Sequence, residues 1–417
     1  MKLNKWKALG LTAFMALALV ACNAEGESSE KEKEATATKT EQVEKEAKHN
    51  HAETATARFV VSSDKAVHIL DDKFQQIEQF DIGSGAFSVV DSGRYVFVRD
   101  AENKDSYTLL DSGFYVEDHA DHMHPYEDKP AIAKNEVEAA SPAHMISHAG
   151  RTAIFNDGSG KVDVYENDTL ATDTYKPAFV YEGAAHHGAA VPLSTGELAV
   201  TVVAKEGDAL PTGVKIVGKD GKETATVTKS CEGLHGTAYS GEGDNEKLAF
   251  GCIGKAVVYD VAGKKATDVV LPDKEARVGT VKLGENSDYI FTNYSIENEP
   301  QNKVGVINAK TGDFKLVELP AAYKSATLVA PDNKAYVLTE DGNLYKIDLQ
   351  KAEIELTVSA FNPFNLEEEA PALFMANEIV YVAMPSYQKI YAVHGDHIHE
   401  SATLDFVPTA FAALGVK

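Results

Sequence analysis

The sequence predicts an all-β protein, a β-propeller of eight blades, with seven blades as the alternative. Two observations favour this fold. Short runs of β-branched and aromatic residues, such as 95–98, 152–155, 289–292 and 335–338, are bounded by turn residues, and no long amphipathic helix separates them. The segment 58–417 also holds too many such strands for a β-sandwich and repeats with a regular period.

The recurring unit is a strand of small residues, a turn and an apolar strand. Copies begin near residues 87, 144, 187, 235, 280, 327, 373 and 411. Most steps between these positions are close to the roughly 40 to 50 residues of a four-stranded propeller blade. The longest step, from 87 to 144, contains a histidine-rich hexad and predicts an elongated connection there.

The two ends of this segment complement each other. The last copy, 408–415, has the innermost-strand pattern but no strands after it, whereas the domain opens at Arg58 with three strands and no innermost strand before them. Joining both ends in one blade removes two open sheet edges. We therefore expect the N- and C-terminal strands to close the ring within one blade.

The first 57 residues predict export and anchoring. Three lysines precede an apolar run at 8–21 that is short for a membrane span of roughly 20 residues, and small residues then precede Cys22. This pattern is typical of a bacterial lipoprotein signal over 1–21, with lipidation at Cys22. Residues 22–57 lack large apolar side chains and predict a flexible tether. The protein would be held at the outer face of the cytoplasmic membrane, as in Gram-positive bacteria.

Histidine clusters predict zinc binding. The pattern H-x-D-H-x-H occurs twice, and imidazole is the commonest protein ligand of zinc, with carboxylate as a further ligand. Solvated polar loops are the alternative. The first hexad and the strand of the second repeat supply His119, Asp121, His122, His124, His144 and His148. The second hexad and the tether supply auxiliary candidates: His394, Asp396, His397, His399, His49 and His51.

Propeller geometry predicts a site in the central channel. His144, His187 and His235 occupy matching positions of three consecutive repeats, so their side chains are expected near one mouth of the channel. His186 is an auxiliary candidate beside His187, and His148 is expected towards the other mouth. The glycines in the two His-Gly pairs leave room for an ion. Channel histidines bonded only to water are the alternative.

Several motifs together resemble a known family. They are the H-x-H pair on the tether, the loop 118–124, the runs 142–150 and 156–160, and the two His-Gly pairs at 187–188 and 235–236. They are similar to the AztD zinc metallochaperones, over essentially all of the chain from residue 58. The resemblance implies a β-propeller that binds zinc outside the cytoplasm and hands it to the zinc-binding subunit of an ABC importer. The lipoprotein signal and the second hexad depart from the family pattern.

Cysteine content and charge agree with this interpretation. Cys231 and Cys252 flank strands of one blade and could reach each other, so we favour a disulfide in an exported protein, with free buried thiols as the alternative. The net charge of −24 argues against nucleic-acid binding and suits cations. We expect a monomer.

Two further functions stay open. The clusters favour a carrier over an enzyme, because they are redundant and lack a clear general base, whereas catalysis needs a rigid constellation. A metal-dependent propeller hydrolase or lactonase would keep an open metal position for water. A surface scaffold with incidental histidines is the third interpretation. We expect a non-enzymatic zinc carrier.

Overall fold

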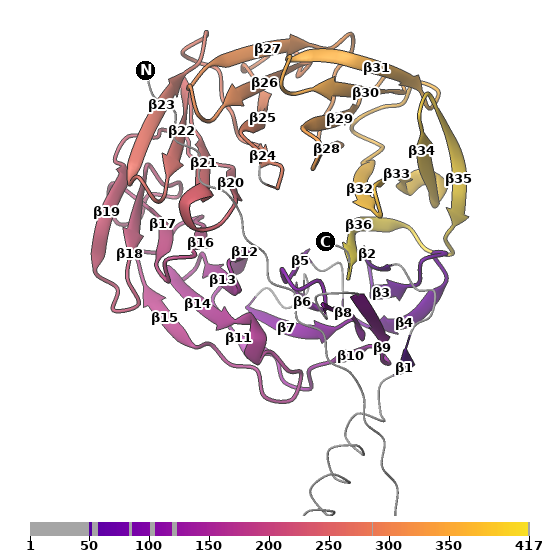
Figure 1. Cartoon of the computed structure of the whole chain (residues 1–417), viewed down its shortest axis with the longest axis horizontal. Helices are drawn as coiled ribbons and strands as arrows, with labels where there is room; N and C mark the ends of the chain where they lie inside the picture. The colour runs from indigo at the N-terminus through magenta and orange to yellow at the C-terminus, as the bar shows by residue number, and fades with distance from the viewer. Residues whose placement is uncertain are drawn as a thin grey trace, which may run out of the picture. The chain divides into compact units, whose positions relative to one another are not determined.

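The structure is a computed structural model that describes residues 50–51, 57–82, 86–100, 105–118, 123–285 and 287–415. Residues Asn50–Lys417 make up one compact unit. Within it, eight small antiparallel sheets are arranged around a ring, with one strand of each nearest the centre (Figure 1). The predicted fold class is confirmed, with eight blades.

Blades 1 to 4 take the following strands from the centre outwards. Blade 1 has β36 (Pro408–Leu414), β2 (Arg58–Ser63), β3 (Val67–Leu70) and β4 (Gln76–Phe80). Blade 2 has β5 (Ala86–Val89), β6 (Tyr95–Arg99) and β7 (Ser106–Asp111), flanked by β10 (Ala131–Ile132) and β11 (Val137–Glu138). Blade 3 has β12 (Pro142–His148), β13 (Arg151–Asn156), β14 (Lys161–Glu166) and β15 (Phe179–Glu182). Blade 4 has β16 (Ala190–Pro192), β17 (Leu198–Val202), β18 (Gly213–Val217) and β19 (Glu223–Thr228).

Blades 5 to 8 repeat this order. Blade 5 has β20 (Thr237–Ser240), β21 (Lys247–Gly251), β22 (Lys255–Asp260) and β23 (Lys265–Val270). Blade 6 has β24 (Val281–Leu283), β25 (Tyr289–Tyr294), β26 (Lys303–Asn308) and β27 (Phe314–Glu318). Blade 7 has β28 (Thr327–Ala330), β29 (Lys334–Leu338), β30 (Asn343–Asp348) and β31 (Glu353–Ser359). Blade 8 has β32 (Ala372–Ala376), β33 (Ile379–Met384), β34 (Lys389–His394) and β35 (His397–Thr403). Three short 3₁₀ turns are described: Asn167–Thr169, Gly243–Asn245 and Pro385–Tyr387.

The chain ends close the ring as predicted. β36 is the innermost strand of blade 1 and pairs antiparallel with β2, with Val60 opposite Ala412. The last strand of the chain therefore completes the blade that the first propeller strand begins. The edges at which β36 and β2 face each other are therefore both paired, and neither is left open.

The hydrophobic core is divided among the blade interfaces. Eight clusters of buried side chains are found in the described part of the chain, and each fills the space between two neighbouring blades. Strand alternation explains this arrangement, since successive side chains point to opposite faces of a sheet. In β21, for example, Leu248 and Phe250 pack towards blade 4, whereas Ala249 packs towards blade 6.

The long connection in blade 2 forms structure of its own. β8 (Phe114–Asp118) and β9 (Met123–Glu127) make a hairpin, and β1 (Asn50–His51) pairs with the outer edge of β9. β1 lies within the stretch 22–57 that the sequence predicts to be a tether, so part of that stretch joins the folded unit. The signal segment, Cys22 and His49 lie outside the described residues. None of the helical turns that the structure does describe is long and apolar enough to cross a membrane.

Candidate metal centre

Three imidazoles from three consecutive blades lie together at the centre of the ring. His144 belongs to β12, His187 to the loop that leads into β16, and His235 to the loop that leads into β20. One ligand nitrogen from each ring lies within 4.8 Å of the others. Among the described residues, this is the one group of three or more histidine, cysteine or carboxylate side chains whose ligand atoms already lie this close to one another.

Local backbone features aim these rings inwards. The pairing of β12 with β13 shifts register between Pro142 and Met145, so His144 lies in a β-bulge, which redirects a side chain out of the regular ladder. The other two loops are fixed by backbone hydrogen bonds, from the amide of His187 to the carbonyl of Ala209 and from the amide of His235 to that of Gly251. Each imidazole is thus held by the sheet of its own blade.

All three rings use the same nitrogen for a hydrogen bond. Nδ1 of His144 donates to the carbonyl oxygen of Gly188 over 2.9 Å, and Nδ1 of His235 donates to that of Gly279 over 2.8 Å. Nδ1 of His187 donates to Oδ2 of Asp157 over 2.6 Å. Carbonyl and carboxylate oxygens only accept, so each Nδ1 carries the proton and each Nε2 keeps its lone pair. This is the tautomer that a metal-binding histidine needs, with its other nitrogen bonded to a second residue.

The spacing of the rings suits one tetrahedral ion. Zinc-bound imidazoles at Zn–N distances of about 2.1 Å have ring centroids roughly 5 Å apart and nitrogens about 3.4 Å apart. The centroid distances are 4.7 Å for His144–His187, 5.7 Å for His187–His235 and 6.2 Å for His144–His235. Small side-chain rotations would therefore bring the nitrogens from within 4.8 Å to ligand distance.

A cavity of about 230 Å³ lies at the three rings, and its wall is largely apolar, with Ile146, Leu234 and Pro211 among the lining residues. Burial lowers the pKa of His144, and the nearby His187 lowers it further. Because a metal competes with protons for the imidazole lone pair, a depressed pKa keeps His144 ready to bind at neutral pH. The site is not sealed, since the side chain of His187 is 40% exposed.

Asp157 is a site residue that the sequence analysis did not name as a ligand or as a partner of one. It follows β13, and its carboxylate accepts hydrogen bonds from Nδ1 of His187 and, over 3.3 Å, from the amide of Gly188. It therefore orients the imidazole for a metal. Its place in the motif 156–160 was a signal in the sequence. The contact between blades that brings it to His187 could not be predicted from the sequence.

The two glycines of the His-Gly pairs line the cavity at the three rings, and protein packing also favours glycine at both positions. A Cβ on Gly188 would lie 2.4 Å from the ring of Phe155. Gly236 has a φ of +83°, a left-handed conformation that favours glycine, and its Cβ would lie 2.6 Å from the carbonyl oxygen of Gly279. That oxygen accepts the hydrogen bond from His235. These glycines allow the close backbone approach that positions the ligands.

His186 does not join the three rings. Its Nδ1 donates to the carbonyl of Ala184, and its Nε2 is bonded to the hydroxyl of Thr201 over 2.9 Å. Both nitrogens are therefore occupied within the protein. The ring packs edge-on against Phe155, so His186 supports the loop that carries His187.

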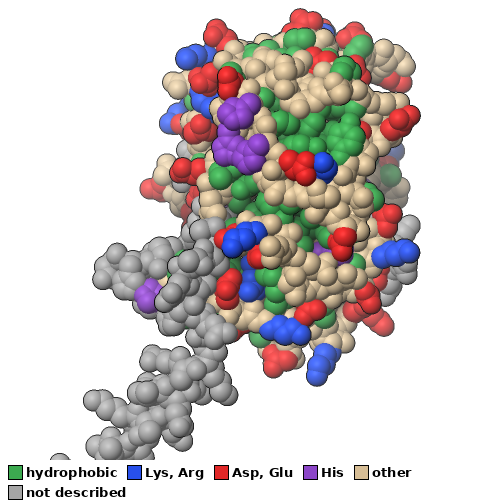
Figure 2. Space-filling view, turned by 90° about the vertical axis from the view of Figure 1, so that its right-hand side faces the viewer, with side chains coloured by type: hydrophobic (Ala, Val, Ile, Leu, Met, Phe, Trp, Pro, Cys, Tyr) green, Lys and Arg blue, Asp and Glu red, His purple; other side chains and the backbone are tan. Residues whose placement is uncertain are grey.

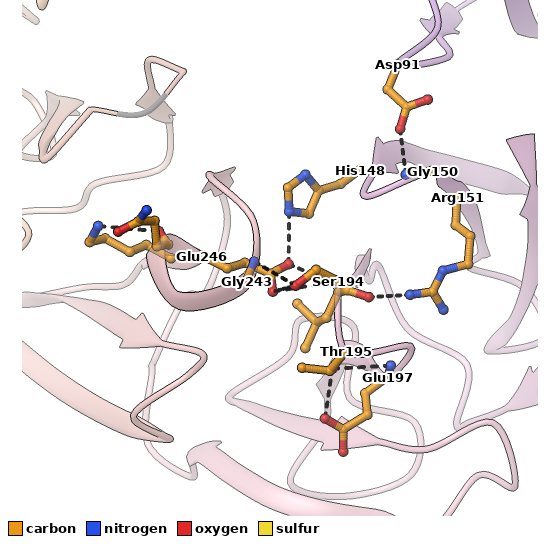
Figure 3. A network of polar contacts seen from close by, with 12 residues as sticks. Asp91, His148, Gly150, Arg151, Ser194, Thr195, Glu197, Gly243 and Glu246 are labelled. Atoms are coloured by element: carbon orange, nitrogen blue, oxygen red, sulfur yellow. Dashed lines mark hydrogen bonds and ion pairs between the residues drawn. The ribbon is translucent and has the colours of Figure 1, made fainter. Parts of the chain in front are cut away.

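His148 lies at the opposite end of β12 from His144, about 13 Å away at roughly 3.3 Å per residue. Figure 3 shows its imidazole directed at Glu246, and Nε2 donates to Oε1 over 3.0 Å. The amide and hydroxyl of Ser194 bind the same carboxylate. Burial would raise the pKa of Glu246, but these hydrogen bonds outweigh it and the pKa lies below its usual value. His148 thus belongs to a buried polar network at the other mouth, as its place at the end of the strand suggested, and not to the three-histidine group.

The remaining predicted ligands that the structure describes lie elsewhere. Of the first hexad, His119, Asp121 and His122 lie outside the described residues, and His124 lies on β9 near Tyr126. For His51 only the backbone is described, in β1. The second hexad is described in full and forms the tip of the hairpin between β34 and β35, in blade 8. His124 and the second hexad therefore do not contribute to the group at His144.

A disulfide joins Cys231 and Cys252, whose Cα atoms are 5.1 Å apart. Both cysteines are fully buried, within the core between blades 4 and 5. The bond ties the loop that leads to His235 to the residue that follows β21. It therefore acts, together with the amide bond from His235 to Gly251, as a support for one of the three imidazoles.

Comparison with known proteins places this arrangement in context. The sequence matches no family model. It is 26% identical over 381 residues to the zinc chaperone AztD of Citrobacter koseri, an alignment that covers 87% of each chain. The chain is similar to AztD-type zinc chaperones. The resemblance to AztD inferred from the sequence is thus confirmed.

The fold of AztD is also shared. The crystal structure of Citrobacter koseri AztD superposes with a TM-score of 0.74 and 23% identity, covering 87% of this chain and 98% of AztD. The apo structure of the same AztD gives a TM-score of 0.73 and covers 99% of its chain. The eight-bladed ring described here is therefore the architecture of AztD.

Proposed function

We propose that this protein is a zinc metallochaperone that carries the ion at His144, His187 and His235. The observation that supports this most strongly is the shared tautomer of the three rings, with every Nδ1 bonded to an acceptor and every Nε2 left for a metal. Chance clustering of channel histidines would not require the same nitrogen to be bonded in each ring. The name of the similar protein, a zinc chaperone, supports zinc as the cargo.

The donor set suits a carrier that gives up its ion. Three imidazoles leave one position of a tetrahedral zinc open. The open position can accept a donor from a recipient before any of the three rings lets go. His187, with its side chain 40% exposed, is accessible to such an exchange.

The recipient in this proposal is the zinc-binding solute-binding subunit of an ABC importer, and the transfer takes place outside the cytoplasm. The support is the lipoprotein-like segment ending at Cys22 and the disulfide between Cys231 and Cys252, a bond typical of exported proteins. Lipidation at Cys22 would keep the carrier at the outer face of the membrane, where the importer subunit works. Residues 22–49, as a flexible tether, would let the anchored carrier contact the importer subunit.

Zinc transfer itself tests the proposal. Zinc-loaded protein is mixed with a candidate solute-binding protein, and the rate at which zinc changes hands is compared with its release to a chelator that does not bind the carrier. A faster rate that rises with recipient concentration supports direct transfer. Equal rates would leave a zinc buffer. Hydrolysis of ester or lactone substrates that requires the three histidines would instead favour an enzyme.

A triple substitution ties the function to the site. His144→Ala/His187→Ala/His235→Ala is expected to abolish tight zinc binding and transfer together. His148→Ala is a matched control, because it removes an imidazole from the same strand as His144 without touching the group. Undiminished zinc affinity in the triple variant would contradict the proposal.

A further inference from the structure

The hairpin between β34 and β35 carries a second group of imidazoles, far from the channel in the chain and on another blade. Its turn is Gly395–Asp396, with Gly395 at a φ of +58°, the left-handed conformation that tight hairpin turns assign to glycine. His394 ends β34 and His397 begins β35. Figure 2 looks onto this side of the ring and shows histidine side chains gathered on its surface.

The strand register puts three imidazoles on one face. His394 is directly opposite His397, and Ala392 is directly opposite His399. Opposed residues share a face of the sheet, and so do residues two apart in a strand. His394, His397 and His399 therefore all point to the same side. All three are exposed.

The rings are near the spacing of a shared ion. The centroids of His394 and His399 are 4.3 Å apart, and those of His394 and His397 are 6.2 Å apart. These values lie on either side of the roughly 5 Å expected for imidazoles on one tetrahedral zinc. His394 sits between the other two, so modest rotations about its side-chain bonds would complete the set.

The carboxylate of Asp396 prepares one of the rings. Its Oδ1 lies 3.2 Å from Nδ1 of His397, which therefore donates the hydrogen bond and leaves Nε2 for a metal. A carboxylate behind a ligating imidazole is the usual outer partner of a zinc-bound histidine.

The opposite face of the hairpin fixes its backbone. Val393 and Ile398 are partly buried and pack in the hydrophobic cluster between blades 7 and 8. The alternation of apolar and imidazole side chains therefore anchors the hairpin on one side and presents the histidines on the other. A cluster on a mobile loop would lack this support, whereas here the ligand positions are set by a paired ladder.

We propose that His394, His397 and His399 form a second, solvent-open binding site for a zinc-like divalent cation, with Asp396 as a positioning residue. The site shares no residue with the channel group and stands independently of it. Three nitrogen ligands leave a coordination position for water or for a donor from another molecule. Its exposure makes it a site where ions exchange quickly with the surroundings.

The test counts zinc ions bound by the full chain at equilibrium, in dialysis against buffered micromolar zinc. His394→Ala/His397→Ala/His399→Ala is expected to bind one equivalent fewer than the unsubstituted protein. The variant His399→Ser/Glu400→His keeps three imidazoles in the hairpin but moves one to the other face. It is expected to lose the same equivalent, or to bind it at least about tenfold more weakly. The unfolding midpoint without zinc, unchanged in both variants, shows that the hairpin still forms.

Two results would overturn the proposal. One is an unchanged number of bound ions in the hairpin triple variant. The other is full binding by the face-swapped variant, which would mean that any exposed imidazoles suffice. The variant lacking His144, His187 and His235 separates this site from the proposed carrier site, because it is expected to keep the hairpin ion while losing the channel ion.

Discussion

Replacing Asp157 by alanine tests how the channel site is prepared for a metal. The carboxylate holds Nδ1 of His187 over 2.6 Å, at the short end for such a bond, and also binds the amide of Gly188. Loss of an outer carboxylate partner typically weakens metal binding by about 10- to 100-fold, or about 1.4 to 2.7 kcal/mol. The short, charge-assisted bond places Asp157→Ala near the middle of that range, at about thirtyfold.

The assay is zinc competition with a chromophoric chelator at pH 7.5. Asp157→Asn keeps an acceptor oxygen for Nδ1 of His187 and is expected to weaken binding less than Asp157→Ala. Asp220→Ala is a matched control, because this aspartate lies in the exposed turn between β18 and β19 and pairs with Lys222, away from the channel. Zinc affinity unchanged in Asp157→Ala would refute the assignment of Asp157 as an orienting residue.

Three further predictions follow from the same contacts. His148→Ala removes one hydrogen bond from the fully buried Glu246 and should lower the free energy of unfolding by about 1 to 3 kcal/mol. Zinc affinity should stay the same. A large loss of zinc affinity would show that His148 is a zinc ligand. Cys231→Ser/Cys252→Ser opens a loop with a sequence separation of 21 and should lower the free energy of unfolding by about 3 kcal/mol in denaturant titrations. Zinc binding should also weaken, because the loop that carries His235 is no longer tied to β21. Stability equal to that of the oxidised protein would contradict this. Burial lowers the pKa of both His144 and His186, so on acidification the unfolded chain binds protons at a higher pH than the folded protein does. The free energy of unfolding of the zinc-free protein should therefore be full above about pH 6.5 and fall as the pH drops below it. Urea midpoints that do not change from pH 7.5 to 5.5 would contradict this.

The architecture was readable from the sequence because a propeller repeats one simple pattern. The eight repeat positions lie in the innermost strands or within three residues before them, as at 187, 235 and 280. Alternation within each strand also predicted two buried faces, which the clusters on either side of β21 illustrate. The incomplete repeats at 58 and 408 predicted the closure by β36 and β2, since each had an unpaired edge.

The channel group followed from the same repetition, but its supporting residues did not. Matching positions placed His144, His187 and His235 at one mouth, which needs only the repeat and the ring. Asp157 and the carbonyls of Gly188 and Gly279 act across blade boundaries, in contacts that depend on the bulge in β12 and on loop conformation.

The two hexads show the limit of pattern matching. They share the spacing H-x-D-H-x-H, yet His394 to His399 fall on a tight hairpin whose register decides which rings share a face. The sequence shows that the ligands are near each other, whereas only strand pairing shows which of them point the same way. The role of His186 was hidden for a similar reason, since its partner Thr201 lies on a neighbouring strand of the same blade.

Anomalous diffraction at the zinc absorption edge, from crystals of the zinc-loaded protein, tests the central claim most directly. The account predicts a strong peak about 2 Å from Nε2 of His144, His187 and His235, with Nδ1 of each ring still bonded to its acceptor. Zinc bound elsewhere, with these three rings free of metal, would contradict it.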